Sequence, residues 1–353
     1  MNTGGTAPGA AMAAEIAQQP QVLAALLARA GDLAAVATAV HRRAPRFMLV
    51  TARGTSDHAA LYAKYLAEIT RGLPVGLVSP STMTVYGARP DLAGVLFVAV
   101  SQSGASPDLA ESTAAARTCG ATTLAVVNAT GSELATAAEF TVELGAGPER
   151  AVAATKSYTA ELLALYLLLA GTADPAAAAA ALPDAAAATL ARAPAADAAA
   201  ARYRFASRLV TTGRGYSYPT ACEGALKLME TSYLSAHAFS TADLLHGPVA
   251  MLDSAVPVIA VVSPGRGGQA ALPVVRRLRE AGVDVLVVGS GTAGTPAAGT
   301  GAAALPVAGD HLTEELLPVL EILPLQQLAW RLAIDRGGDP DTPRGLAKVT
   351  RTR

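Results

Sequence analysis

The sequence predicts an α/β protein built from two similar halves, each a doubly wound parallel sheet with helices on both faces. Two observations support this prediction. In the first half, apolar runs of strand length alternate with helix-like runs, and residues 95–100 lack the polar alternation of a solvent-facing strand. The same alternation recurs from residue 202, again with glycine-containing turns after the strands. We therefore expect two three-layer αβα domains in tandem.

The elements of the first half follow from apolar runs and turn residues. We expect strands at residues 47–51, 75–78, 94–100 and 123–127, with a helix-like run ending at Leu66 after the first strand. A further helix is expected at residues 106–119, because Pro107 suits a first helical turn, where its missing N–H costs nothing.

The second half repeats this pattern. Strands are expected at residues 208–212, 256–262 and 283–288, and a helix runs from the turn at residues 213–215 to Tyr233. The alanine-rich segment between the halves contains prolines, which limit it to short helices. The expected organisation is a disordered lead (1–11), a first domain (12–172), a helical connector (173–201), a second domain (202–338) and a C-terminal tail (339–353).

Composition and charge exclude several classes of protein. The 353 residues carry a formal net charge of −1, and only 16% are charged, so no broad basic face is expected for nucleic acid. The apolar stretches end before the length of about 18 residues that a membrane span needs, and the N-terminus lacks the pattern of a secretory signal. The two cysteines, Cys119 and Cys222, resemble small buried hydrophobic residues. We expect a cytoplasmic protein that binds neither nucleic acid nor membrane.

Hydroxyl side chains follow two of the predicted strands. Ser101, Gln102 and Ser103 precede a glycine where the strand at 94–100 turns into a helix, and Ser106 lies one step further. Thr55 and Ser56 occupy the equivalent place after the first strand. A helix N-terminus with small hydroxyl residues favours an anion, and loops at one edge of a parallel sheet converge, so we expect a shared phosphate site. The alternative is that each serine caps its own helix.

Three charged residues share one face of the helix that follows residues 213–215. Glu223 and Lys227 are four residues apart, and Lys227 and Glu230 are three apart. One interpretation is a solvated ladder of ion pairs. The other is a site in which Glu230 transfers protons while Glu223 and Lys227 orient it.

Two further residues lie in segments shaped by proline. His246 precedes a Gly-Pro turn, where a lone histidine is more often structural than catalytic. Lys348 lies in a tail stiffened by prolines, which could place its amine across a site instead of in solvent. The five histidines show no spacing typical of metal ligands, so we expect neither a metal nor a cofactor.

Together these motifs resemble the tandem sugar-isomerase (SIS) domain proteins, in particular the isomerase half of glucosamine-6-phosphate synthase and the SIS-type glucosamine-6-phosphate deaminases. The resemblance extends from Met12 to Thr350. It rests on residues 54–56, 101–104, 149–156, 213–215, 223–230, 246–248 and 346–348.

The resemblance implies a role for each matching residue. Glu230 would move a proton between C1 and C2 of the sugar, His246 would open the ring and Lys348 would form an imine with a ketose. It also implies a homodimer, because the family's histidine reaches over from a neighbouring subunit into a shared active site. Glu149 would line the same pocket, and the 6-phosphate would be bound by Gly54, Thr55, Ser56, Ser101, Gln102, Ser103 and Ser106.

The sequence departs from the family pattern in two respects. The synthase carries a glutaminase domain, whereas this chain starts at its Gly-rich lead, so we expect no synthesis of glucosamine 6-phosphate from glutamine. Near the expected base, Met229 replaces a basic residue, Ser235 replaces a histidine and His237 replaces an acid. These changes either alter the proton routes around Glu230 or only remodel the outer surface.

Three functions are compatible with these motifs and departures. The first is a deaminase and isomerase that converts glucosamine 6-phosphate to fructose 6-phosphate and ammonia. The second is a dehydratase that eliminates water across C2 and C3 of N-acetylglucosamine 6-phosphate, since that substrate has no free amine to lose. The third is a non-catalytic sugar-phosphate sensor, which the absence of a helix-turn-helix or basic module disfavours.

Overall fold

The computed structural model describes residues 7–290 and 304–348, which form two compact units. The first lobe, as we call it, comprises residues 21–149 and 156–180. The second lobe comprises the N-terminal residues up to Pro20, residues 150–155 and residues 181–348. The second lobe therefore combines segments that are distant from one another in the sequence.

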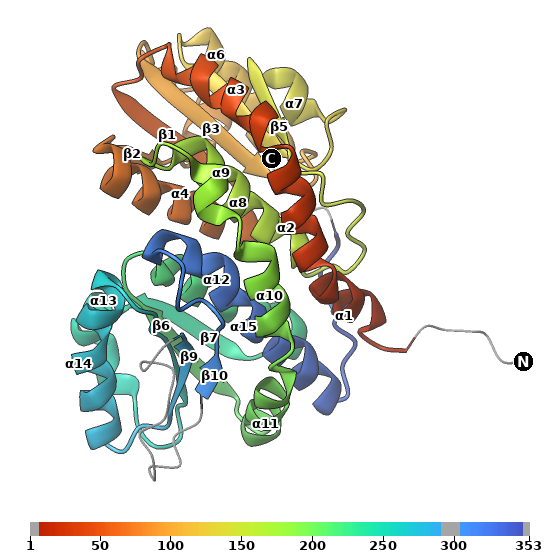
Figure 1. Cartoon of the computed structure of the whole chain (residues 1–353), viewed down its shortest axis with the longest axis vertical. Helices are drawn as coiled ribbons and strands as arrows, with labels where there is room; N and C mark the ends of the chain where they lie inside the picture. Colours follow the sequence, from red (N-terminus) through yellow and green to blue (C-terminus); the bar gives the residue numbers. More distant parts are fainter. Residues whose placement is uncertain (1–6, 291–303, 349–353) are drawn as a thin grey trace, which may run out of the picture. The chain divides into compact units, whose positions relative to one another are not determined.

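The described part of the first lobe contains a five-stranded parallel sheet in the order β2-β1-β3-β4-β5 (Figure 1). Phe97, Ala99 and Leu109 belong to cores formed with α5, α6 and α7, which cover one face. Leu96 and Val98, which point to the opposite face, are also buried, and α4 contacts both β1 and β3. The strands are β1 (Phe47–Thr51), β2 (Val75–Leu77), β3 (Val95–Ser101), β4 (Thr122–Val127) and β5 (Phe140–Glu143).

Helices connect these strands and cover the sheet. Helix α8 contacts both α3 and α4, and α6 contacts both α5 and α7. Their bounds are α2 (Gln19–Ala28), α3 (Ala30–His41), α4 (Thr55–Arg71), α5 (Ser81–Thr84), α6 (Pro107–Thr118), α7 (Glu133–Ala137), α8 (Lys156–Leu169) and α9 (Pro175–Ala179).

The described part of the second lobe contains a parallel sheet of five strands in the order β10-β9-β8-β6-β7 (Figure 1). Val258, Ala260 and Val274 form a core between the sheet and α14. Helices α10, α11 and α12 all contact α15. The strands are β6 (Arg208–Gly213), β7 (Ser235–Ser240), β8 (Val258–Val261), β9 (Val285–Gly289) and β10 (Ala304–Pro306).

The second lobe contains both 3-10 helices and α-helices. The 3-10 helices are η1 (Pro248–Met251) and η3 (Glu314–Leu316). The α-helices are α1 (Ala10–Ala17), α10 (Leu182–Leu190), α11 (Ala193–Tyr203), α12 (Ser217–Ser232), α13 (Thr241–Leu245), α14 (Arg266–Glu280) and α15 (Leu317–Asp335).

The two lobes repeat one topology. Counted from the first strand of each lobe, both sheets have the order 2-1-3-4-5, so the strand order reverses between β1 and β3 and between β6 and β8. In open α/β sheets, ligands bind beyond the carboxyl ends of the strands at such a switch point. The turn after the first strand is also repeated: Gly54 and Gly215 both have φ +59°, which is a left-handed conformation that suits glycine. The predicted pair of doubly wound sheets is therefore confirmed.

Some boundaries differ from those expected. Helix α1 begins at Ala10, before the expected start of structure near Met12, and residues 1–6 of the expected lead lie outside the described residues. The expected connector contains three short helices, each with a proline in its first turn: Pro175, Pro183 and Pro194. Strands β5, β7 and β10, which each lie at the edge of a sheet, were not predicted.

No single helix in the described ranges is both long and apolar enough to cross a membrane. The bent pair formed by α2 and α3 meets the criterion when the two are taken together, by length and composition only.

Candidate functional site

The loop from β3 to α6 forms a compact turn at the switch point of the first lobe. The Ser101 Oγ accepts a hydrogen bond of 3.1 Å from the N–H of Gly104, and the Ser103 Oγ accepts one of 3.3 Å from the N–H of Ala105. Gly104 has φ +61°, and a Cβ there would lie 2.1 Å from the Ser132 Oγ. This turn therefore requires glycine, and it places Ser101, Gln102 and Ser103 directly before the N-terminus of α6.

Ser106 occupies the N-cap position of α6 with an extended backbone. Within the described residues its side chain makes no capping hydrogen bond to that helix. The simple capping interpretation therefore does not account for Ser106. The first N–H groups of α6 and their partial positive charge suit an anion at this position.

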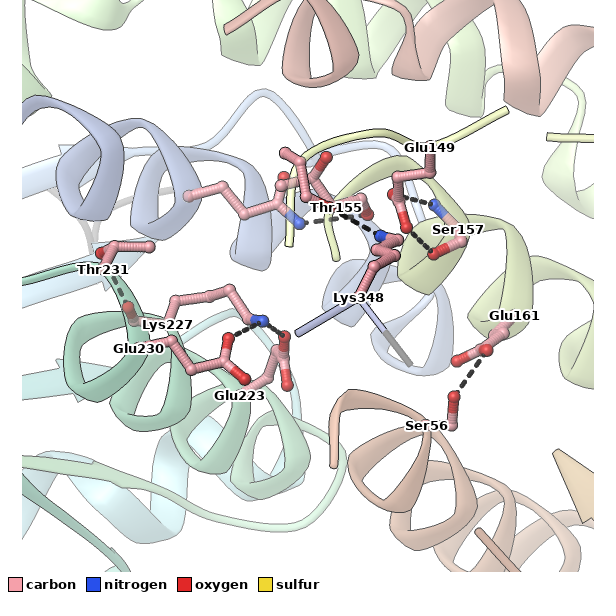
Figure 2. A network of polar contacts seen from close by, with 12 residues as sticks. Ser56, Glu149, Thr155, Ser157, Glu161, Glu223, Lys227, Glu230, Thr231 and Lys348 are labelled. Atoms are coloured by element: carbon pink, nitrogen blue, oxygen red, sulfur yellow. Dashed lines mark hydrogen bonds and ion pairs between the residues drawn. The ribbon is translucent and has the colours of Figure 1, made fainter. Parts of the chain in front are cut away.

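The neighbouring loop, from β1 to α4, brings Gly54, Thr55 and Ser56 to the same edge of the sheet, since β1 and β3 are adjacent parallel strands. Ser56 is buried and donates a hydrogen bond of 2.7 Å to Oε1 of Glu161 on α8 (Figure 2). A phosphate bound by Ser56 would therefore compete with Glu161 for the hydroxyl hydrogen of Ser56. The neighbouring residue, Thr55, is half-buried.

An ion pair joins these two loops. The guanidinium of Arg53 donates to Oδ2 of Asp108 from both Nε (2.9 Å) and Nη2 (2.7 Å). Asp108 is buried in the first turn of α6, and its charge is balanced by the partly exposed Arg53. Arg53 and Asp108 were not among the residues predicted from the sequence. The signal available was a cation beside the glycine turn and an acid directly after Pro107.

The second lobe contains a buried charge cluster on α12. The Lys227 ammonium lies 2.5 Å from Oε2 of Glu230 and 3.3 Å from Oε1 of Glu223 (Figure 2). The side chains of Lys227 and Glu223 are 0% exposed, whereas that of Glu230 is 21% exposed. The cluster is therefore not a solvated ladder of ion pairs, and Glu230 is the member that a ligand can reach.

Helix α12, which carries this cluster, packs closely against α15. A Cβ at Gly224 would lie 2.9 Å from Cδ1 of Leu325, so glycine allows the two helices to approach closely. Burial alone would lower the pKa of Lys227, but the carboxylates of Glu223 and Glu230 outweigh it and raise that pKa above its usual range. Lys227 therefore stays protonated and holds the Glu230 carboxylate in an ion pair.

Glu149 makes local contacts in the first lobe. Its Oε1 accepts a hydrogen bond of 3.1 Å from the Ser157 N–H, and its Oε2 accepts one of 2.7 Å from the Ser157 hydroxyl (Figure 2). Because Ser157 lies in the first turn of α8, the buried carboxylate satisfies the start of that helix. The structure thus gives Glu149 a helix-capping contact besides the expected place in a pocket.

His246 and Lys348 lie in irregular segments of the second lobe. His246 ends α13 as its C-cap residue, and its side chain is exposed. Lys348 is half-buried and donates a hydrogen bond of 2.7 Å from Nζ to the carbonyl oxygen of Ala151. The proline-containing tail is described up to Lys348, whereas residues 349–353 lie outside the described residues.

The three departures from the family pattern are all exposed. Met229 on α12 is 40% exposed, and Ser235 and His237 lie on the outer side of β7, which is an edge strand of its sheet. The His237 ring stacks at 6.4 Å from the ring of Phe239. These positions favour a remodelled outer surface. Among the described residues, no group of three or more histidine, cysteine or acidic side chains could hold a metal ion.

Comparison with known proteins identifies relatives along nearly the whole chain. A glutamine–fructose-6-phosphate aminotransferase (isomerizing) from Methanothermobacter thermautotrophicus is 33% identical over 311 residues, which is 84% of this chain and 50% of that protein. The same enzyme from Gloeobacter violaceus is 36% identical over 313 residues, covering 85% of this chain and 51% of that protein. This chain therefore spans about half the length of these relatives.

Solved structures show the same fold. The C-terminal domain of glucosamine-fructose-6-phosphate aminotransferase from Francisella tularensis aligns with a TM-score of 0.86 at 26% identity, covering 97% of this chain and 100% of that one. A protein proposed to be a phosphosugar isomerase, from Silicibacter pomeroyi, aligns with a TM-score of 0.81 at 33% identity, covering 94% and 99%. The SIS domain model matches residues 43–171 and 203–307, and the chain belongs to the SIS domain family.

Proposed function

We propose that this chain is an aminosugar-phosphate deaminase and isomerase that converts glucosamine 6-phosphate and water to fructose 6-phosphate and ammonia. The observation that carries the proposal is the α12 cluster, in which a buried ammonium holds the one partly exposed carboxylate, that of Glu230. The aminotransferase and phosphosugar-isomerase relatives support a sugar phosphate as the substrate.

Binding rests on the loops of the first lobe. The 6-phosphate accepts hydrogen bonds from the N-terminus of α6 and from hydroxyls of Ser101, Ser103 and Ser106, with Gln102 and Thr55 beside them. Arg53 offsets the charge of Asp108, which would otherwise repel a phosphate at this helix end. No cofactor or metal takes part in this scheme.

Ring opening comes first, because the closed hemiacetal has no acidic C–H bond. The imidazole of His246 transfers the proton between the anomeric hydroxyl and the ring oxygen, giving the open-chain aldehyde. The exposure of His246 supports a homodimer in which this residue acts in the site of a second copy.

The Glu230 carboxylate then removes the proton from C2, which the neighbouring aldehyde has made acidic. Return of that proton to C1, together with transfer of one proton from the C2 amine to the C1 oxygen, gives a C1 hydroxyl and a ketose imine at C2. The Lys348 amine attacks C2 and displaces ammonia, and water hydrolyses the resulting lysine imine to fructose 6-phosphate. Lys227 keeps Glu230 oriented through their ion pair.

A parallel assay of two substrates tests the proposal. Purified protein is expected to release ammonia from glucosamine 6-phosphate, with fructose 6-phosphate as the second product. Water loss and a new ultraviolet chromophore from N-acetylglucosamine 6-phosphate, without ammonia from the first substrate, would instead establish the dehydratase. Thermal stabilisation by both compounds without turnover of either would establish a sensor.

A further inference from the structure

The C-terminal tail is attached to the second lobe at several points before it reaches Lys348. Asp339 accepts a hydrogen bond of 2.8 Å from the N–H of Gly9. Asp341 accepts two of 2.8 Å from the N–H groups of Ala11 and Met12, in the first turn of α1. These carboxylates satisfy the N-terminus of α1 and fix the start of the tail.

The next attachment is made by Tyr233, which follows α12 directly. Its hydroxyl accepts a hydrogen bond of 2.9 Å from the Arg344 N–H, and the Arg344 guanidinium lies 4.1 Å from the centre of its ring. One side chain thus holds both the backbone and the cation of the same tail residue. We call this pair the Tyr233–Arg344 clasp.

The backbone at Tyr233 is unfavourable for a tyrosine. Its φ is +56°, and this left-handed position at the end of a helix is usually occupied by glycine. In the described residues, Ala44 with φ +46° is the other non-glycine residue with a positive φ. Strain of this kind persists where the surrounding structure requires the side chain, and here the Tyr233 side chain contacts Arg344 with both its hydroxyl and its ring.

We propose that the Tyr233–Arg344 clasp is a positioning device, which couples the end of the helix bearing Glu230 to the tail segment bearing Lys348. Glu230 lies three residues before Tyr233, and Lys348 lies four residues after Arg344. The clasp therefore leaves only short stretches of chain between itself and the two groups that act in sequence on C2. This inference rests on the proposed function, since it assigns Lys348 the imine step.

The clasp should affect the rate of the reaction at Lys348 as well as the stability of the fold. An amine held near its target reacts as an intramolecular group, and small displacements of such a group reduce rates by about 10²-fold. Loss of the clasp should therefore reduce the rate of imine formation at Lys348 and lower kcat more than it raises KM, because the phosphate loops belong to the other lobe.

Borohydride trapping of the imine with fructose 6-phosphate is the direct test. The variants are Tyr233→Gly, which removes the clasp and relieves the backbone strain, and Tyr233→Phe, which retains the ring beneath Arg344 but loses the hydroxyl. The matched control is Ala44→Gly, which relieves the same kind of strain without touching the tail. The readouts are the mass of the trapped peptide containing Lys348, the steady-state constants and hydrogen exchange at the Arg344 amide.

We expect wild type and Ala44→Gly to give equal amounts of trapped peptide. Tyr233→Gly should give about tenfold to a hundredfold less trapped peptide, at an unchanged or higher melting temperature. Tyr233→Phe should give an intermediate amount. Exchange at the Arg344 amide should accelerate in both Tyr233 variants. Wild-type trapping in Tyr233→Gly, or unchanged exchange, would overturn the clasp. Absence of trapping in wild type would instead refute the role of Lys348, and the exchange experiment would still decide whether the clasp holds the tail.

Discussion

The hydroxyl of Ser56 donates a hydrogen bond of 2.7 Å to the buried carboxylate of Glu161, and the second lobe repeats this pair with Ser217 and Glu321 at 2.8 Å. In each lobe the bond joins the helix after the first strand to a later long helix, α4 to α8 and α12 to α15. The repeat shows that this serine position fastens helices in both lobes. Any phosphate contact of Ser56 is therefore additional to a structural role.

Glu321 leads to a prediction about pH. It is fully buried and accepts hydrogen bonds from Ser217 and Thr220, and burial raises its pKa above the usual value for a glutamate. Between the unfolded pKa of about 4.3 and the raised folded pKa, the native state binds more protons, so this group's contribution to stability falls as pH rises. Glu321→Gln cannot ionise, so its melting temperature relative to wild type should be higher at pH 8 than at pH 5. An equal difference at both pH values would contradict this account.

Gly104 provides a test of the β3–α6 turn. Gly104→Ala places a methyl group 2.1 Å from the Ser132 Oγ and also forces a left-handed alanine, so we expect a loss of about 2–4 kcal/mol in the free energy of unfolding. The matched control is Gly87→Ala, because Gly87 has a similar φ of +66° with nothing within 4 Å of the added atom. Urea unfolding should show the smaller loss, about 1 kcal/mol, in the control. The KM for the sugar phosphate should rise only in Gly104→Ala.

Lys227 leads to a second prediction about pH, at the alkaline end. The pKa of Lys227 in the folded state is raised above its unfolded value of about 10.4. Its contribution to the free energy of unfolding is therefore complete below about pH 10 and is lost as pH rises further. Lys227→Met should cost about 3–5 kcal/mol at pH 7, because it leaves Glu223 buried without its counter-charge. Melting temperatures from pH 8 to 11 should fall less steeply in the variant than in wild type. Parallel curves would show that Lys227 does not stabilise the fold through its charge.

Much of the fold could be predicted because the central strands are buried on both faces. Residues 95–100 and 209–212 carry continuous apolar or small side chains, which are typical of a covered parallel sheet, and both runs lie in central strands. The edge strand β7 was missed, because its alternation of small and polar residues with exposed Ser235 and His237 gives little apolar signal.

The site was predictable as a set of residue types, but its burial was not. Glu223, Lys227 and Glu230 lie at helical spacing whether they face water or the protein interior, and only the burial of Glu223 and Lys227 in the folded chain distinguishes the two cases. Arg53 and Tyr233 were missed for a related reason, since their partners, Asp108 and Arg344, lie 55 and 111 residues away in the sequence.

Glu230→Gln provides the most direct test of the proposed chemistry. The amide keeps the shape of the side chain and an oxygen that can accept from Lys227, but it cannot take a proton from C2, so turnover of glucosamine 6-phosphate should fall by about 10²–10⁴-fold. Because the phosphate loops are unchanged, thermal stabilisation by the substrate should stay near the wild-type value. Glu280→Gln, at an exposed position on α14, controls for loss of a carboxylate elsewhere in the same lobe and should retain full activity. The decisive measurement is solvent deuterium uptake at C2 and C1 of recovered sugar phosphate: uptake by Glu230→Gln at the wild-type rate would assign the base to another residue.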